Sequence, residues 1–257
     1  MEQAICILAA VREELSGILR QMAVSGKRKI GRADLWSGSW QGRPLLLVRT
    51  GVGHRRASLA LSEVLRSHQP GLIVSIGYAG GADPALRVGD LLLAETILEP
   101  PGGEWSAGDG KSPPARFDID AALAARFAAV TPPEGVTLHR GALLTVGEVV
   151  TGPENKRALG ARYGACALDM ETAALARLAR DSGLPFISLR AISDAADDAL
   201  MDVSPFLEKD GEVSKLKAGW YVLTHPTAIG TLRSLQVVAR QATARMTDFL
   251  AGAVREL

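Results

Sequence analysis

Acidic side chains follow predicted strands at three places in the sequence, and carboxyl groups in such positions are suited to acid and base chemistry. Glu14 comes soon after the apolar run at residues 4–10, Glu171 follows a short apolar run, and Asp194 directly follows the apolar stretch at 186–193. Open parallel sheets place their ligands at the carboxyl ends of their strands. We therefore expect the three carboxyl groups to meet on one face. Glu14 and Glu171 also suit a helix start, where interaction with the helix dipole alone explains an acid.

Arg190 lies inside the same apolar strand that leads to Asp194. An unpaired cation in a protein interior is costly, and buried charges are normally paired. We therefore expect Arg190 to have a partner inside the fold.

Two glycine clusters also stand at predicted strand ends. The first, residues 51–53, lacks the third glycine of the dinucleotide motif G-x-G-x-x-G because Arg56 takes that place, so we discount this motif. Its backbone N–H groups can still approach an anion or a hydroxyl-rich ligand, or the turn is purely structural. The second cluster is S-I-G-Y-A-G-G at residues 75–81. Gly53 and Gly80 are therefore candidate substrate-binding positions.

Apolar strands alternate with amphipathic helices along most of the chain. This alternation predicts an α/β fold with a largely parallel sheet that helices cover on both faces. Residues 99–115 are rich in Pro, Gly and Ser, and we expect a long loop there, either a lid or a disordered segment. The expected strands cover 4–10, 35–39, 44–49, 72–76, 88–96, 142–146 and 186–191, and the expected helices cover 13–22, 55–67, 118–130, 153–162, 171–181 and 227–257.

The composition is that of an ordinary globular protein. The chain has 257 residues, of which 47% are hydrophobic, and a formal net charge of +1. We expect one domain over residues 1–257 and no nucleic-acid partner, because phosphate binding needs clustered basic residues. Cys6 and Cys166 lie in apolar stretches and are expected to be free thiols in a reducing cytoplasm. No apolar run approaches the roughly 18 residues that a membrane span needs.

Six short motifs together resemble those of the nucleoside phosphorylase and nucleosidase superfamily. Among its branches, the sequence is most similar to the methylthioadenosine/S-adenosylhomocysteine nucleosidases. The order and spacing of the motifs match from residue 4 to about residue 196. The motifs are A-A-V-R-E-E-L at 9–15, T-G-V-G at 50–53, S-I-G-Y-A-G-G at 75–81, V-G-D at 88–90, L-D-M-E-T-A-A at 168–174 and R-A-I-S-D-A-A at 190–196.

The resemblance implies a single-domain, three-layer α/β/α fold with a twisted, partly barrel-like mixed sheet, and cleavage of the N-glycosidic bond between a purine and a ribose. Asp194 matches the acid that protonates the base at N7, and Glu14 matches the base that activates water. Arg190 matches the position that orients this water and the catalytic carboxylate. Glu171 and Met170 match the pair that binds the ribose. The resemblance implies no metal or organic cofactor.

The residue types agree with this chemistry. Glycosidic bond cleavage develops positive charge on the sugar and negative charge on the departing base. One carboxyl group must therefore arrive protonated and another ionised. Burial favours the neutral form, and the charge of Arg190 favours the ionised form.

The sequence departs from the family pattern at three candidate substrate-binding positions. Tyr78 stands where many members have a serine before A-G-G, and Val150 stands where an aromatic residue stacks near the base, so base recognition is expected to differ. Asp169 replaces the more usual glutamate of V-E-M-E and is shorter by one methylene group.

Phosphorolysis is the first alternative to hydrolysis. The phosphorylases of the superfamily hold phosphate with an arginine and a serine where Ser75 and Tyr78 stand, which favours water as the nucleophile here. A phosphate site built another way would draw on four arginines near the ends of the strands expected at 4–10 and 44–49, which are Arg12, Arg49, Arg55 and Arg56. A nucleoside sensor without catalysis is a further alternative, although binding alone does not require both an acid and a base.

The chain continues beyond the matching core of residues 4–196 with an extension and a long helix at 197–257. Some branches have similar tails, including a hopanoid-associated group that acts on adenosine with a bulky apolar 5′-group. Relatives commonly complete their pockets with a neighbouring subunit, so we expect a homodimer or a higher homo-oligomer. Apolar residues of the extension either line a pocket for such a 5′-group or pack the last helix onto the core, and they are Met201, Phe206, Trp220 and Tyr221.

Overall fold

The computed structural model describes residues 3–101, 113–199 and 228–257, with 228–238 described by their backbone alone. Three expectations fall outside the described residues. They concern most of the loop expected over 99–115, much of the extension that begins at residue 197, and the pocket or packing role of Met201, Phe206, Trp220 and Tyr221.

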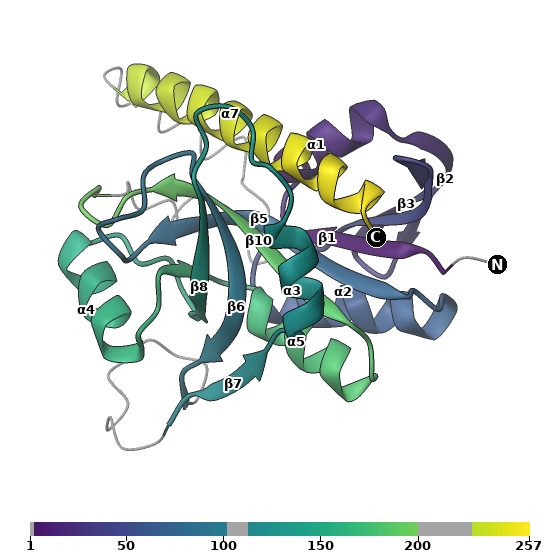
Figure 1. Ribbon diagram of the computed structural model, residues 1–257, viewed down its shortest axis with the longest axis horizontal. Helices are drawn as coiled ribbons and strands as arrows, with labels where there is room; N and C mark the ends of the chain where they lie inside the picture. The colour runs from purple at the N-terminus through teal and green to yellow at the C-terminus, as the bar shows by residue number, and fades with distance from the viewer. Residues whose placement is uncertain (1–2, 102–112, 200–227) are drawn as a thin grey trace.

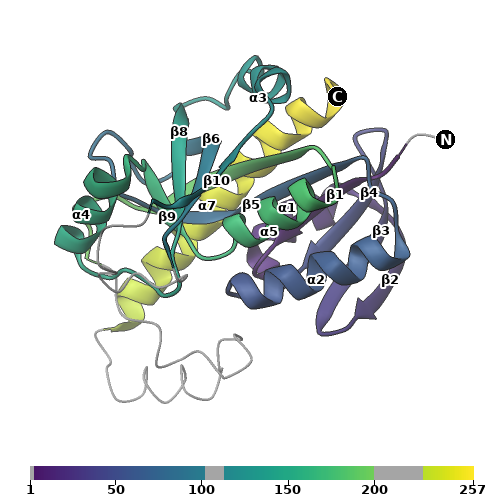
Figure 2. The ribbon, with the colours of Figure 1, turned by 90° about the horizontal axis from the view of Figure 1, so that it is seen from below.

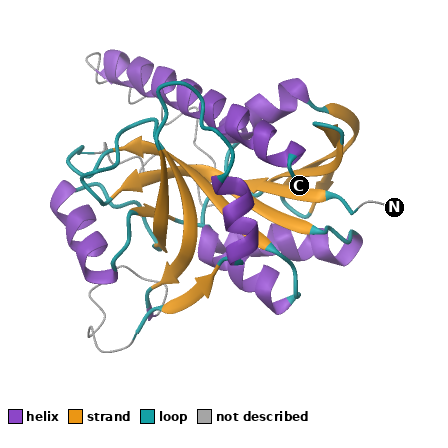
Figure 3. Cartoon of the chain, viewed as in Figure 1, coloured by secondary structure: helices purple, strands orange, loops and turns teal. Residues whose placement is uncertain are grey.

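A ten-stranded sheet forms the centre of the molecule (Figure 3). Its strands are β1 (Ile5–Ala9), β2 (Ala23–Ile30), β3 (Ala33–Trp40), β4 (Arg43–Arg49), β5 (Leu72–Gly81), β6 (Leu91–Glu99), β7 (Ala115–Asp118), β8 (Leu138–Thr145), β9 (Ala167–Asp169) and β10 (Phe186–Asp194). Strand β1 pairs in parallel with β4 on one side and with β5 on the other. The antiparallel strands β3 and β2 extend the sheet beyond β4.

Part of the sheet closes on itself. The strand order runs β10-β6-β8-β9-β5, and β5 pairs again with β10, so five strands form a closed, barrel-like unit. Strand β5 belongs both to this unit and to the open part of the sheet. The twisted, partly barrel-like mixed sheet implied by the resemblance is thus confirmed.

Helices cover the sheet on two sides (Figures 1 and 2). They are α1 (Arg12–Gln21), α2 (His54–Ser67), α3 (Ala121–Ala128), α4 (Pro153–Tyr163), α5 (Thr172–Asp181) and α7 (Ala228–Arg255). Successive side chains of a strand point to opposite faces, and β1 shows the result: Ile7 packs in the core with α1 and α7, whereas Cys6 and Leu8 pack in the core with α2 and α5. Within the described residues, no helix is long and apolar enough to cross a membrane.

Helix α7 contributes to the same core as the first strand and helix. Its Met246, Phe249 and Leu250 are buried and belong to one cluster with Ile7 and Leu15. Burying a large apolar side chain contributes roughly 1.5–3 kcal/mol. The final helix, which follows the expected 4–196 core, is therefore part of the same buried cluster as β1 and α1.

The prediction of a largely parallel sheet was wrong. Strands β2, β3 and β4 follow one another through short turns and pair antiparallel, and β6 pairs antiparallel with β10 and β7. Alternation with helices indicates parallel pairing only where a helix intervenes. Strand β5 also runs on through Gly77 to Gly81, where glycines give no apolar signal. No strand was expected at β2 or β7, and β9 lies on the short apolar run before Glu171.

Candidate active site

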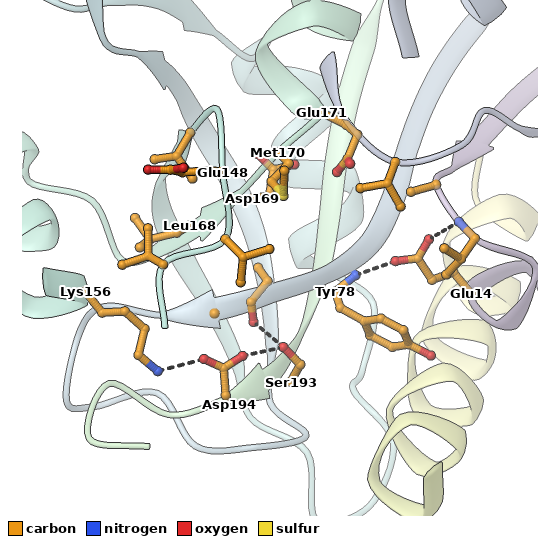
Figure 4. Close-up of a pocket in the computed structure, with 18 residues that line it drawn as sticks. Glu14, Tyr78, Glu148, Lys156, Leu168, Asp169, Met170, Glu171, Ser193 and Asp194 are labelled. Atoms are coloured by element: carbon orange, nitrogen blue, oxygen red, sulfur yellow. Dashed lines mark hydrogen bonds and ion pairs between the residues drawn. The ribbon is translucent and has the colours of Figure 1, made fainter. Parts of the chain in front are cut away.

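The sequence-predicted acids line a single cavity of about 310 Å³ (Figure 4). It lies where β1, β5, β9 and β10 end and where α1 and α5 begin. Its described lining consists of Ala10, Val11, Glu14, Val52, Tyr78, Ala79, Gly80, Val146, Glu148, Val149, Val150, Lys156, Leu168, Asp169, Met170, Glu171, Ser193 and Asp194. All the expected site residues lie in this lining except Gly53 and Arg190, which contact lining residues from behind.

Glu14 sits in the first turn of α1 and is held by two backbone donors. The N–H of Val11 donates to Oε2 at 3.0 Å, and the N–H of Tyr78 donates to Oε1 at 2.9 Å. Burial raises the pKa of this carboxyl group, although the two N–H donors and the charge of Arg190 act in the opposite direction. The side chain is thus fixed in one orientation at the junction of β1 and β5.

Gly77 permits this orientation. A Cβ atom added at residue 77 would lie 2.8 Å from Oε1 of Glu14 and 3.3 Å from Nη1 of Arg190. The first separation is too short for real Cβ contacts. Glycine is therefore needed where β5 passes between the carboxylate and the guanidinium.

A second, much smaller cavity of about 10 Å³ lies behind Glu14. Its polar lining comes from Glu14, Thr50, Ser75, Glu171 and Arg190. A single water molecule requires about 10–15 Å³ of such volume and two to four polar partners. The space therefore suits one water beside the Glu14 carboxylate and is too small for a phosphate ion.

Arg190 has the buried partner that its position in an apolar strand requires. Its Nη2 and Nε atoms donate to Oδ2 of Asp169 at 2.9 and 3.2 Å, and Nη2 also donates to Ser75 Oγ at 2.7 Å and to Thr172 Oγ1. Oδ1 of Asp169 accepts from Thr145 Oγ1 at 2.7 Å. Asp169, although it borders the cavity, thus directs both carboxylate oxygens to protein groups.

Glu171 is the N-cap residue of α5 and faces the cavity. The backbone N–H of Gly53, at the N-cap of α2, donates to its Oε1 at 2.7 Å. Burial, reinforced by the nearby charge of Asp169, raises the pKa of Glu171 to about 8. Gly53 therefore directs its N–H to a protein carboxyl group, and that group carries a proton at neutral pH.

Asp194, the last residue of β10, is bound on both oxygens. Lys156 Nζ donates to Oδ2 at 2.7 Å, and the two side chains are only 1% and 4% exposed. Oδ1 lies 2.6 Å from Ser193 Oγ. Lys156 Nζ also donates to the carbonyl oxygen of Ala195 at 2.6 Å. Figure 4 shows Lys156, Asp194 and Ser193 as one connected group at one end of the cavity.

The remaining predicted residues form apolar walls. Val150 is buried, Met170 is half-buried, and Gly80 leaves room for Asp194, since a Cβ there would lie 3.0 Å from Oδ2. The Tyr78 ring lines the cavity, but its hydroxyl is bonded away from it, at 2.6 Å from Thr243 Oγ1 of α7. Burial raises the pKa of Tyr78 to about 12, so this hydroxyl stays protonated.

Sequence reasoning missed Lys156. Its neighbours P-E-N and Arg157 are polar, which is typical of an exposed helix start. The available signal was spacing, because Lys156 stands three and four residues before Leu159 and Gly160 on the buried side of α4. None of the four arginines considered for a phosphate site, Arg12, Arg49, Arg55 and Arg56, is among the described residues that line either cavity.

Metal-binding and thiol chemistry find no support in the described part of the chain. No three His, Cys, Asp or Glu side chains gather there as a metal site would require. Cys6 and Cys166 are free thiols, and neither lines the cavity. Burial raises the pKa of both thiols, so neither is a ready thiolate nucleophile.

Comparison with known proteins identifies related sequences and folds. The family model described as the phosphorylase superfamily matches residues 4–218. The 5′-methylthioadenosine/S-adenosylhomocysteine nucleosidase of Actinobacillus succinogenes is 28% identical over 78% of this chain and 90% of its own length. That of Geobacillus kaustophilus is 28% identical over 79% and 89%.

Solved structures share the fold at lower sequence identity. A Helicobacter pylori nucleosidase mutant with 5′-methylthioadenosine in its active site aligns with a TM-score of 0.78 and 21% identity over 100% of both chains. Futalosine hydrolase of the same species aligns with a TM-score of 0.77 and 21% identity over 99% of this chain and 98% of its own.

Proposed function

Because the chain belongs to the phosphorylase superfamily, we propose that it hydrolyses the N-glycosidic bond of an adenosine-type nucleoside modified at the 5′ carbon. The products are the free base and the sugar. The observation that carries the choice of hydrolysis is the water-sized space of about 10 Å³ beside Glu14, Ser75 and Arg190.

Glu14 is the general base in this reaction. The C1′ atom of the ribose becomes electron-poor as the bond to the base breaks, and a water molecule beside Glu14 adds to it. The water gives its hydroxyl group to C1′ and its proton to Glu14. The N–H groups of Val11 and Tyr78 fix the carboxylate for this transfer, so it needs no reorientation.

Arg190 is a positioning residue. Its guanidinium borders the small cavity and holds Asp169, Ser75 and Thr172. Its positive charge lowers the pKa of Glu14 against the effect of burial. Arg190 therefore keeps a larger fraction of Glu14 in the ionised form that a base requires.

Asp194 is the general acid. It stands at the opposite end of the cavity from Glu14 (Figure 4), which leaves room for a nucleoside between them. When the glycosidic bond breaks, the electron pair enters the purine ring, and Asp194 protonates the base at N7. General acid catalysis of this kind typically raises the rate by about 10²–10⁴-fold.

The ribose lies between these two groups, beside Glu171 and Met170. A protonated Glu171 donates a hydrogen bond to a ribose hydroxyl, while its other oxygen accepts from Gly53. The thioether of Met170 packs against the sugar face. Apolar walls from Val150 and the Tyr78 ring suit a base and an apolar 5′-substituent.

Phosphorolysis is the second candidate, including phosphorolysis of an adenosine with a bulky apolar 5′-group. The same superfamily is named for this reaction. Two observations favour water. The small cavity behind Glu14 has no room for phosphate. The cations in the described lining of the two cavities are Arg190 and Lys156, and each is already bound to a carboxylate.

The nucleosidase relatives are named for 5′-methylthioadenosine and S-adenosylhomocysteine, and a structural neighbour is named for futalosine. We therefore take 5′-methylthioadenosine as the first test substrate. The free thiols of Cys6 and Cys166 are compatible with a reducing cytoplasm, and we propose that the protein works there as a homodimer or higher homo-oligomer.

The test is a panel of purine nucleosides incubated with and without inorganic phosphate, with free base and sugar product both measured. The panel comprises adenosine, inosine, 5′-methylthioadenosine, S-adenosylhomocysteine and an adenosine with a long alkyl 5′-group. Hydrolysis predicts free base and free sugar at the same rate in both conditions. Base release that requires phosphate and yields a ribose 1-phosphate would identify a phosphorylase instead. Nucleoside binding without release of the base would indicate a nucleoside sensor without catalysis.

A further inference from the structure

Lys156 occupies an unusual position for a lysine. Its side chain is 1% exposed, and it is the only cation among the described residues of the main cavity lining. Its Nζ donates to Asp194 Oδ2 at 2.7 Å and to the carbonyl oxygen of Ala195 at 2.6 Å. An ammonium group has three donors, so two of its three N–H groups fix it to the end of β10.

The position of this cation affects the chemistry assigned to Asp194. Both oxygens of Asp194 accept hydrogen bonds, Oδ2 from Lys156 Nζ and Oδ1 from Ser193 Oγ, so in this arrangement neither oxygen acts as a donor. A general acid, in contrast, must begin its step with a proton. In the resting protein the proton nearest to the leaving base is therefore on Lys156, and the carboxylate of Asp194 lies between the two.

Ser193 can accommodate a proton on Asp194 by turning its hydroxyl hydrogen, without movement of any heavy atom. Its Oγ lies 2.6 Å from Asp194 Oδ1 and 3.2 Å from the carbonyl oxygen of Ala79. A hydroxyl group has one hydrogen to donate. When Asp194 is ionised, Ser193 donates to Oδ1; when Oδ1 carries a proton, it donates to Ser193, and Ser193 donates to Ala79.

We infer that Lys156 is a positioning residue that holds the proton which Asp194 passes to the leaving base. As the C1′–N9 bond breaks, its electron pair enters the purine ring, N7 takes a proton from Asp194, and Asp194 takes one from Lys156. The attacking water loses its proton to Glu14. Lys156, left as a neutral amine, regains a proton from solvent and Glu14 releases one, so the net change is the addition of one water. This inference rests on the proposed function.

The surroundings of the pair are acidic. Asp197 and Asp198 follow β10; Asp197 pairs with Arg157 of α4, and Asp198 accepts from the N–H of Ala195. The other ionisable groups of the described cavity lining are the Tyr78 hydroxyl, which stays protonated, and the carboxyl groups of Glu14, Glu148, Asp169 and Glu171. Among these described groups Lys156 therefore has no second cation beside it.

The test compares the pH dependence of kcat in the wild type, Lys156→Met and Arg157→Met. Methionine keeps the length of the lysine stem without the charge. In Lys156→Met, Asp194 loses the N–H donor that is proposed to resupply its proton. We therefore expect the alkaline decline of kcat to move to lower pH, while activity at low pH is largely kept. Arg157→Met removes the neighbouring ion pair of α4 and keeps the wild-type profile.

Two results would overturn the inference: a Lys156→Met profile that is the wild-type profile scaled by one factor at every pH, or an equal shift in Arg157→Met. A purely structural ion pair gives the first result.

The infrared carboxyl bands of Asp194, isolated as the difference between wild type and Asp194→Asn at neutral pH, give a reading that needs neither turnover nor a folded Lys156 variant. An ionised band supports the pair, and a protonated band contradicts it. If the wild type cleaves no nucleoside, the proposed function fails, and the infrared bands alone decide the state of the pair.

Discussion

The backbone N–H of Tyr78 donates a hydrogen bond of 2.9 Å to Glu14 Oε1, so β5 and the first turn of α1 fix one carboxylate jointly. The Tyr78 hydroxyl, at the other end of the same residue, contacts α7. One residue thus links the proposed base to the C-terminal helix. In Figure 4 the ring of Tyr78 extends toward the pale yellow helix.

Glu14→Gln is expected to lower kcat by about 10²–10⁴-fold, the range for loss of one general base. Glutamine keeps the shape of the side chain and an oxygen for the Tyr78 N–H, so the variant should still bind substrate or free base. Steady-state kinetics and a binding titration measure the two effects. Glu13→Gln is the matched control, because Glu13 is an exposed neighbour on the same helix. A Glu14→Gln enzyme with normal turnover would remove Glu14 from the base role.

Gly77→Ala is expected to displace Glu14, because the new Cβ would lie 2.8 Å from its Oε1. We expect a loss of kcat of at least about tenfold, together with destabilisation of the order of 1–3 kcal/mol, as for overpacking in a core. Gly152→Ala is the control, since its Cβ would meet side-chain atoms at ordinary distances of 3.5 Å or more. Equal kcat values in the two variants would show that activity does not depend on the close approach of β5 to the Glu14 carboxylate.

Asp194→Asn is expected to reduce turnover by about 10²–10⁴-fold while substrate still binds. The loss should be much smaller for a riboside whose leaving group departs as a stable anion, such as nitrophenyl riboside, because that group needs no proton. The ratio of the two losses is the measurement. Equal losses on both substrates would assign Asp194 to binding or folding.

The raised pKa of Glu171 predicts a pH-dependent stability. Its ordinary value is 4.5 and its value in the folded protein is about 8, so between these values the folded state holds more protons than the unfolded state. The contribution of this group to stability therefore falls as pH rises from about 4.5 to about 8. Glu171→Gln removes the effect, so its Tm minus that of the wild type should become more positive across this range and then level off.

Glu148→Gln is the control for this series, because Glu148 borders the same cavity but is exposed. A Tm difference for Glu171→Gln that stays constant with pH would contradict the raised pKa. The same variant should also weaken the preference for ribosides over 2′-deoxyribosides, since Glu171 is proposed to bind the ribose.

Tyr78→Phe separates the two contacts of Tyr78. The variant loses the hydroxyl bonds to Thr243 Oγ1 and the Ala239 carbonyl oxygen but keeps the backbone N–H that holds Glu14. We expect a loss of about 1 kcal/mol in the free energy of unfolding with kcat within about threefold of wild type. Tyr163→Phe, which removes a hydroxyl with no hydrogen bond among the described residues, should leave stability unchanged. A large fall in kcat with unchanged stability would contradict the assignment of the Tyr78 hydroxyl to stability and of its backbone N–H to catalysis.

The sequence predicted those strands and helices in which buried apolar side chains recur at a regular spacing. The run at residues 4–10 became β1, and the helical spacing after it became α1, because apolar side chains must be buried at period 2 or 3.6 wherever they occur. Strand β9 was recognised only as a short apolar run without bounds, because three residues are too few to show a period. The extension of β5 was missed because Gly77, Gly80 and Gly81 have no side chains to show one.

The sequence predicted the acidic residues of the site, but not all of the cations that pair with them. Glu14, Glu171 and Asp194 stand at element boundaries, where a carboxyl group is conspicuous, and all three line one cavity. Which cation neutralises which acid depends on contacts distant in sequence: Lys156 meets Asp194 across 38 positions, and Arg190 meets Asp169 across 21. No local pattern encodes such a pairing, and the tertiary structure alone reveals it.

The most direct test of hydrolysis is the fate of the oxygen atom that attacks C1′. The wild-type protein is incubated with 5′-methylthioadenosine in water enriched in oxygen-18, with phosphate present, and the sugar product is analysed by mass spectrometry after trapping as a stable derivative. Hydrolysis beside Glu14 predicts a free sugar that carries one heavy oxygen at C1′. A sugar 1-phosphate without heavy oxygen at C1′ would contradict it.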